Sequence, residues 1–149
     1  MVWDGVLELA SQVTMDVLPD ILVVHWGGND LAQRSGKSLV LQVIADLRVF
    51  VSWCVIWSAV IQCLVWKAAC DTRRIDWAWK GINRQFSRAV WRGLRSVVIH
   101  PHFKVSHPEL YREDGVHLSD QGLDIFLEDL QGGLRAEMFQ LVGGMGHTK

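Results

Sequence analysis

The stretch "DILVVHWGGNDLA", residues 20–32, decides how the rest of the chain is interpreted. Its first half is a continuous run of β-branched and other apolar residues, the pattern of a strand buried on both faces of a parallel sheet. Two glycines, an asparagine and an aspartate follow at once. Functional groups in such sheets lie on loops beyond the carboxyl ends of the strands, so these polar residues stand where a site is expected.

Apolar spacing predicts further elements before and after this strand. In chain order, the expected elements are a helix at 3–18, the strand at 20–26, a helix at 38–50, a strand at 54–61, a helix at 72–94, a strand at 96–101 and a last helix that Ser119 caps and that Gly132 and Gly133 close. This alternation predicts an α/β fold of three layers, α/β/α, with a parallel, flavodoxin-like sheet.

Composition indicates one globular domain over residues 1–149. The net charge of −1 gives no overall field that favours nucleic acid, and no nucleic-acid partner is expected. The three cysteines, Cys54, Cys63 and Cys70, lack the spacing of a disulfide framework or a metal site. The first residues lack the basic and apolar segments of a signal peptide, so we expect an intracellular, cytoplasmic protein.

Residues 49–66 allow two interpretations. The segment carries no charged residue and lies between Arg48 and Lys67. It is also just long enough to span a bilayer. The alternative is the end of a helix, a turn and a buried strand, which the β-branched residues of its second half favour. A membrane-inserted protein is therefore kept as an alternative to a globular one.

The segment "DGVH", Asp114–His117, is the second place where chemistry is expected. A carboxylate and an imidazole three residues apart on a turn can meet, which would orient the ring and leave its other nitrogen as a general base. The motif alone is common, and taken by itself it is better explained by a helix-start acid beside a surface histidine.

Together, the two segments resemble two blocks of the SGNH (GDSL-type) hydrolase superfamily. "GGND" resembles the G-x-N-D block, with Gly27 or Gly28, Asn29 and Asp30, and "DGVHLS" resembles the D-x-x-H block. The likeness covers about residues 3–133, leaving 134–149 as a tail, and is greatest to the esterase-like SGNH domain of vertebrate retroelement-derived proteins.

The resemblance implies serine ester hydrolysis on a small ester or acyl substrate, without a metal or an organic cofactor. It implies that His117 accepts the proton of the attacking serine, that Asp114 orients His117, and that the amide of Asn29 donates to the oxyanion. Asp30 would hold the loop, and the glycines would allow a sharp turn close to a ligand.

The chain departs from the family where the nucleophile is expected. It has no "GDS" or "GHS" turn, and the block that supplies a glycine N–H to the oxyanion hole is also absent. The sequence therefore predicts an SGNH domain without its first strand, its nucleophile and half of its oxyanion hole, with weak or no hydrolysis and an exposed sheet edge.

Three alternatives to an active esterase stay open: a non-catalytic binding or interaction module, the membrane-inserted protein, and a truncated retroelement product. Two other patterns favour ordinary structural roles. Lys80, Arg84, Arg88 and Arg92 recur every four residues and indicate the solvated face of a helix. His100, His102 and His107 lack metal-ligand spacing and are expected to be polar loop residues.

Overall fold

Three parallel strands form the centre of the computed structural model, which describes residues 20–26, 28, 30–31, 34–47, 54–66, 71–89 and 96–144. The strands are β1 (Ile21–His25), β2 (Cys54–Ser58) and β3 (Ser96–Val98), in the spatial order β1-β2-β3. Ile21 pairs with Cys54 and His25 with Ser58, while Ser58 also pairs with Val98. The prediction of a parallel sheet is confirmed, and the three carboxyl ends lie at one edge.

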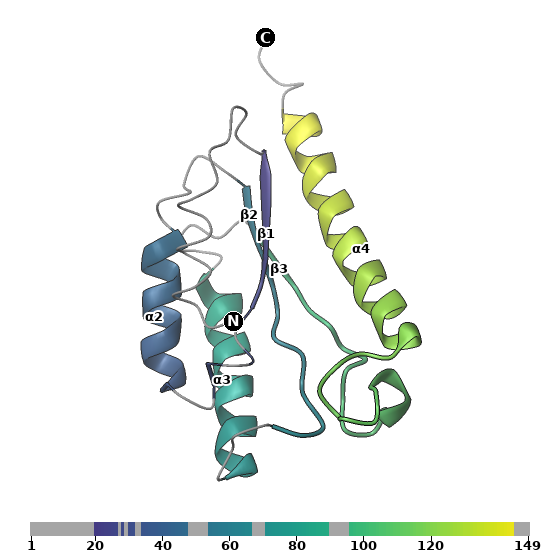
Figure 1. Ribbon diagram of the computed structural model, residues 1–149. Coiled ribbons are helices and arrows are strands. Elements are labelled where there is room, and N and C mark those ends of the chain that lie inside the picture. The colour runs from purple at the N-terminus through teal and green to yellow at the C-terminus, as the bar shows by residue number, and fades with distance from the viewer. Residues whose placement is uncertain are drawn as a thin grey trace, which may run out of the picture.

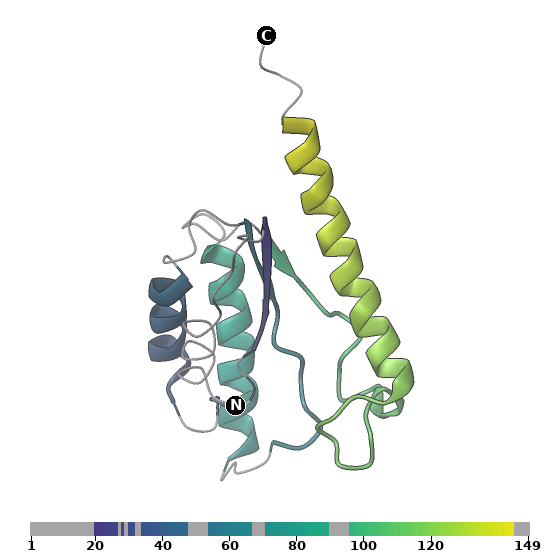
Figure 2. The same cartoon turned by 45° about the horizontal axis from the view of Figure 1, so that its top comes forward.

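Helices cover both faces of this sheet. Helices α2 (Gly36–Leu47) and α3 (Thr72–Ala89) lie side by side on one face, and α4 (Asp120–Gly144) lies on the other (Figures 1 and 2). The predicted α/β/α layering is therefore confirmed. The helix expected at 3–18 lies outside the described residues. Within the described part of the chain, β1 pairs with β2 alone.

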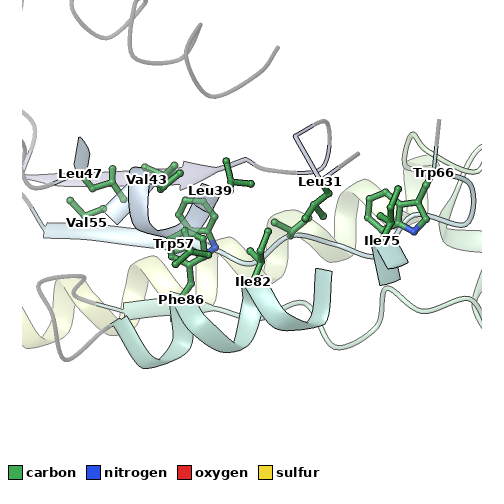
Figure 3. Packing of buried hydrophobic residues seen from close by; sticks show 13 residues of the cluster. Leu31, Leu39, Val43, Leu47, Val55, Trp57, Trp66, Ile75, Ile82 and Phe86 are labelled. Carbon is green, nitrogen blue, oxygen red and sulfur yellow. The ribbon is translucent and has the colours of Figure 1, made fainter. Parts of the chain in front are cut away.

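Strand β2 alternates its side chains between the two layers. Val55 and Trp57 face α2 and α3, where they join a cluster with Leu39, Val43, Ile82 and Phe86 (Figure 3). The rings of Trp57 and Phe86 stack with centroids 3.8 Å apart, a contact worth about 1 kcal/mol beyond the area that it buries. Ile56 and Ser58 have no exposed surface, and the pleat directs them to the opposite face, toward α4.

The two later strands are shorter than the sequence predicts. β2 ends at Ser58 because Asn83 of α3 takes over the hydrogen bonds of Val60: its Oδ1 accepts from the Val60 N–H at 3.0 Å and its Nδ2 donates to the Val60 carbonyl at 2.8 Å. A helix side chain thus occupies the place of a neighbouring strand. On the same helix, Lys80, Arg84 and Arg88 are exposed, as expected for a solvated face, and Arg92 lies outside the described residues.

Helix α4 begins where expected but does not end at the glycine pair. The hydroxyl of Ser119 accepts from the N–H of Gly122 at 3.1 Å, which confirms the N-cap. The prediction that Gly132 and Gly133 close this helix is wrong, since α4 continues to Gly144. A Cβ on Gly133 would lie 2.2 Å from Cγ2 of Val98. The glycine therefore allows the helix to approach β3 closely instead of ending it.

Residues 54–58 of the apolar segment 49–66 form the central strand, which confirms the strand interpretation for that part. Residues 49–53 lie outside the described residues. Across the described ranges, none of the helices combines the length and the apolar character that a bilayer crossing requires.

The glycine pair gives a matched test of the close approach between α4 and the sheet. Gly133→Ala should lower the free energy of unfolding by about 1–3 kcal/mol, because its methyl group would overlap Val98. Gly132→Ala, where a Cβ would meet open space, should raise it by up to about 1 kcal/mol. Urea titrations followed by circular dichroism measure both changes, and equal effects of the two substitutions would contradict the packing.

Candidate functional site

The "DGVH" segment forms a tight turn between β3 and α4. Asp114 closes it, because its Oδ1 accepts from the N–H groups of Val116 and His117, both at 2.9 Å. The Arg112 N–H donates to the carbonyl of His117 at 2.8 Å, and Tyr111 bridges Leu118. The backbone thus fixes the position from which the His117 side chain starts.

Gly115 is the residue that this turn requires. Its φ of +66° lies in the left-handed region, and a Cβ would lie 2.9 Å from Cγ2 of Val65. Its carbonyl accepts from the N–H groups of Leu64 and Val65, at 2.8 and 3.1 Å. The turn is therefore attached to the segment that follows β2, beyond the carboxyl edge of the sheet.

Asp114 and His117 are brought together as the sequence predicts. Nδ1 of His117 lies 2.5 Å from Oδ2 of Asp114, and the His117 side chain is 63% exposed. The hydrogen bond with the His117 ring, supported by the two backbone N–H donors, holds the pKa of Asp114 well below its usual range. The carboxylate stays charged and orients the imidazole, so that Nε2 is the nitrogen left to act on a substrate.

Cys63 is a potential nucleophile close to this turn, and its chemistry argues against that role. Burial, with the nearby charge of Asp114, raises the pKa of its thiol to about 11. The neutral thiol is a poor nucleophile at neutral pH.

The "GGND" loop follows β1, as expected, but only part of it can be placed. Gly27 and Asn29 lie outside the described residues, so the predicted oxyanion donor is not located. Asp30 is 1% exposed, and its carbonyl accepts from the N–H of Arg34 at 2.9 Å. Gly28 does not have a positive φ, and a Cβ there would meet open space, so neither backbone strain nor packing requires a glycine at Gly28.

A second cluster of polar side chains lies at the carboxyl edge of the sheet. The Ser58 cluster consists of His25, Ser58, His100 and Asp129. Oγ of Ser58 lies 2.9 Å from Nδ1 of His25 and 2.8 Å from Nε2 of His100. Nδ1 of His100 lies 2.9 Å from Oδ2 of Asp129. The four residues come from β1, β2, the loop after β3 and α4, so this chain of hydrogen bonds joins two strands and the loop after the third to the helix.

The cluster is buried at its centre and open at one end. Ser58 has no exposed surface and the His100 side chain is 2% exposed, while His25 is exposed at the end of β1. The ring of Phe126 stacks on His100, with centroids 4.6 Å apart, and also contacts His25. Burial lowers the pKa of His100, although its bond with Asp129 acts in the opposite direction. His25 is only partly exposed, and burial of the rest of its side chain, with the neighbouring His100, lowers its pKa to about 4.

His100 lies on a loop, as the sequence predicts, but its side chain is buried in a hydrogen-bonded cluster that the sequence did not indicate. His102 and His107 are exposed, and His107 bonds to Glu109 at 3.0 Å. Ser58 and Asp129 were missed as well. A signal existed for His100, which stands near the end of the strand predicted at 96–101, where a parallel sheet places its functional groups. Ser58 lies inside the strand predicted at 54–61, and its place at a strand end follows only from the structure.

Metal binding has no support in the described ranges, where no group of three or more His, Cys, Asp or Glu side chains could hold an ion. Within the described part of the chain, Cys54 and Cys63 form no disulfide bond.

Comparison with known proteins gives one informative result. No protein family profile and no curated protein matches the sequence. Among solved structures, the chain is similar to a member of the lipolytic protein G-D-S-L family from Veillonella parvula, with a TM-score of 0.64 and 12% identity. The match covers 86% of this chain and 70% of that protein. The α/β fold is therefore that of a GDSL-type hydrolase.

Gly115 provides a test of the "DGVH" turn. Gly115→Ala should lower the free energy of unfolding by about 1–3 kcal/mol, because alanine is strained at positive φ and its methyl group would overlap Val65. Gly81→Ala, in α3 where a Cβ meets open space, is the control and should be neutral or stabilising. Urea unfolding measures both, and a neutral Gly115→Ala would contradict the described turn.

The lowered pKa of His25 predicts that the stability of the fold depends on pH. The pKa of this histidine rises from about 4 in the folded protein to the ordinary 6.5 on unfolding, so the unfolded chain binds more protons between these values. The contribution is fully present above the unfolded pKa and is lost as the pH falls toward the folded one. Wild type should therefore lose stability between about pH 7 and about pH 4.5, and His25→Gln should show a shallower loss. Thermal unfolding across this range measures both slopes, and equal slopes would contradict the burial of the His25 ring.

Proposed function

We propose that the chain is an SGNH-type ester hydrolase domain whose general base is His117. Asp114 orients the ring, and Asn29 donates its side-chain amide to the oxyanion, with Gly27, Gly28 and Asp30 forming the loop that carries it. The substrate is a small ester or acyl compound. The observation that carries the proposal is the 2.5 Å contact between Asp114 and His117 on a turn beyond the carboxyl edge of the sheet. The similarity of fold to a G-D-S-L lipolytic protein supports it.

The chemistry follows from the ring's orientation. With Nδ1 bound to the charged Asp114, Nε2 of His117 accepts the proton of an attacking hydroxyl group, and Asp114 stabilises the imidazolium that forms. A hydrogen-bond donor aimed at the carbonyl oxygen lowers the barrier by a few kcal/mol as negative charge develops there.

The expected turnover is low. The 149 residues contain no "GDS" or "GHS" turn to supply the family's nucleophile. Loss of the nucleophile from a serine hydrolase reduces turnover by a factor on the order of 10⁶. We therefore propose weak hydrolysis that depends on His117, and not the turnover of a complete enzyme.

Hydrolysis of p-nitrophenyl acetate by the purified chain tests this proposal. His117→Ala should lower the protein-dependent rate by about 100-fold, and Asp114→Asn should also lower it, because the ring loses its base or its orientation. His107→Ala is the matched control, since His107 is also an exposed histidine beside a carboxylate, and should keep the wild-type rate.

Three outcomes separate the alternatives. Equal rates in wild type and His117→Ala would overturn the assignment of the base. A short-chain alkyl boronic acid that binds wild type without ester turnover would instead favour the non-catalytic binding module. Turnover at the level of ordinary esterases, about 10 s⁻¹, would show that a nucleophile is present and contradict the expectation of weak hydrolysis.

A further inference from the structure

We propose that Ser58 is a latent nucleophile, with His100 as its general base and Asp129 as the acid that orients His100. Its substrates are small carboxylic esters. This inference does not rest on the proposed function, because it uses a different histidine and a different acid, and a serine that the proposed function does not involve. The three residues have the connectivity of a Ser-His-Asp triad: Oγ to Nε2 at 2.8 Å, and Nδ1 to Oδ2 at 2.9 Å.

The hydrogen-bond directions are determined by the chemistry of the groups. A neutral imidazole carries one N–H, and the Asp129 carboxylate can only accept, so His100 donates from Nδ1. Its Nε2 then has a free electron pair, which accepts the O–H of Ser58. Ser58 has a single proton, and therefore His25 must be the donor in its contact with Oγ. This is the protonation pattern from which a serine is activated.

The surroundings of the cluster also suit this reaction. His25 and Ser58 are the last residues of β1 and β2, and His100 follows β3 by two residues. This is the edge of a parallel sheet at which catalytic groups lie. The rings of Phe126, stacked on His100, and Phe103, edge-on to it at 6.1 Å, separate its imidazole from water. A hydrogen bond between His100 and a charged acid is stronger in such an environment than in water.

Access to Ser58 depends on His25. The serine has no exposed surface, and the electron pair that would attack a substrate currently accepts the N–H of His25. His25 is exposed at the end of its strand, so its side chain can rotate toward solvent. We therefore describe the nucleophile as latent, and the limited space restricts its substrates to small ones.

The reaction proceeds in two balanced halves. Oγ of Ser58 bonds to the carbonyl carbon while its proton moves to Nε2 of His100, and Asp129 stabilises the resulting imidazolium. The C–O bond to the alcohol then breaks, and the departing alkoxide takes the proton from Nε2. A water molecule attacks the acyl-serine by the same route, which releases the carboxylic acid and restores the hydroxyl of Ser58.

Labelling with diisopropyl fluorophosphate, a small probe that phosphorylates activated serines and releases fluoride, tests the proposal. Intact mass and peptide mapping should locate one adduct on Ser58 of the wild type. His100→Ala should slow the labelling by about 100-fold, because the base is lost. His25→Ala should accelerate it, because the covering side chain is removed. A purely structural cluster would not produce this acceleration.

Two controls keep the result independent of folding and of the proposed function. Ser87, an exposed serine on α3, should carry no adduct in the same sample, so wild type alone decides even when a variant fails to fold. His117→Ala should label at the wild-type rate, because His117 is not part of the Ser58 cluster. The proposal is overturned when neither folded wild type nor folded His25→Ala carries an adduct on Ser58, or when His100→Ala labels as fast as wild type.

Discussion

The arrangement of the whole fold depends on the burial of β2 between two layers. The strand is hydrogen-bonded along both edges, to β1 and β3, and its side chains alternate between two kinds of environment. Trp57 packs among apolar residues of α2 and α3, while Ser58, the next residue, is completely buried on the other face. Because a buried hydroxyl requires partners, the face toward α4 must supply them, and His25 and His100 do so.

Helix α4 must also approach this face of the sheet closely, so that its side chains reach the Ser58 cluster. Gly122 lies against the carbonyl of Leu110, where a Cβ would be 2.1 Å from the oxygen, and Gly133 lies against Val98. These contacts bring Asp129, which lies between the two glycines, within reach of His100. The two glycines thus allow the helix to come near, and the carboxylate of Asp129 between them connects it to His100.

The elements that the sequence predicts well are those with local or periodic causes. The apolar run before "GGND" marks β1, and the spacing of Ile82 and Phe86 marks α3. The pair of Asp114 and His117 can be recognised in the sequence because the two residues are only three positions apart. Two kinds of feature were not predictable. The end of β2 depends on Asn83, which is distant in sequence, and the role of Gly133 depends on what lies opposite it. The Ser58 cluster combines residues 29 to 42 positions apart, for which no short motif exists.

This difference in sequence separation determines whether each of the two histidine sites could be transferred to another protein as a single segment. The bonds that join Asp114 to Val116 and His117 lie between neighbours, so a short segment from Tyr111 to Ser119 would carry them into another protein, although it would lose the bonds from Leu64 and Val65 to Gly115. No single short segment contains the residues of the Ser58 cluster. The cluster exists only when the two crossover connections and the last helix have all reached their final positions, so its hydrogen bonds should be among the last to form during folding.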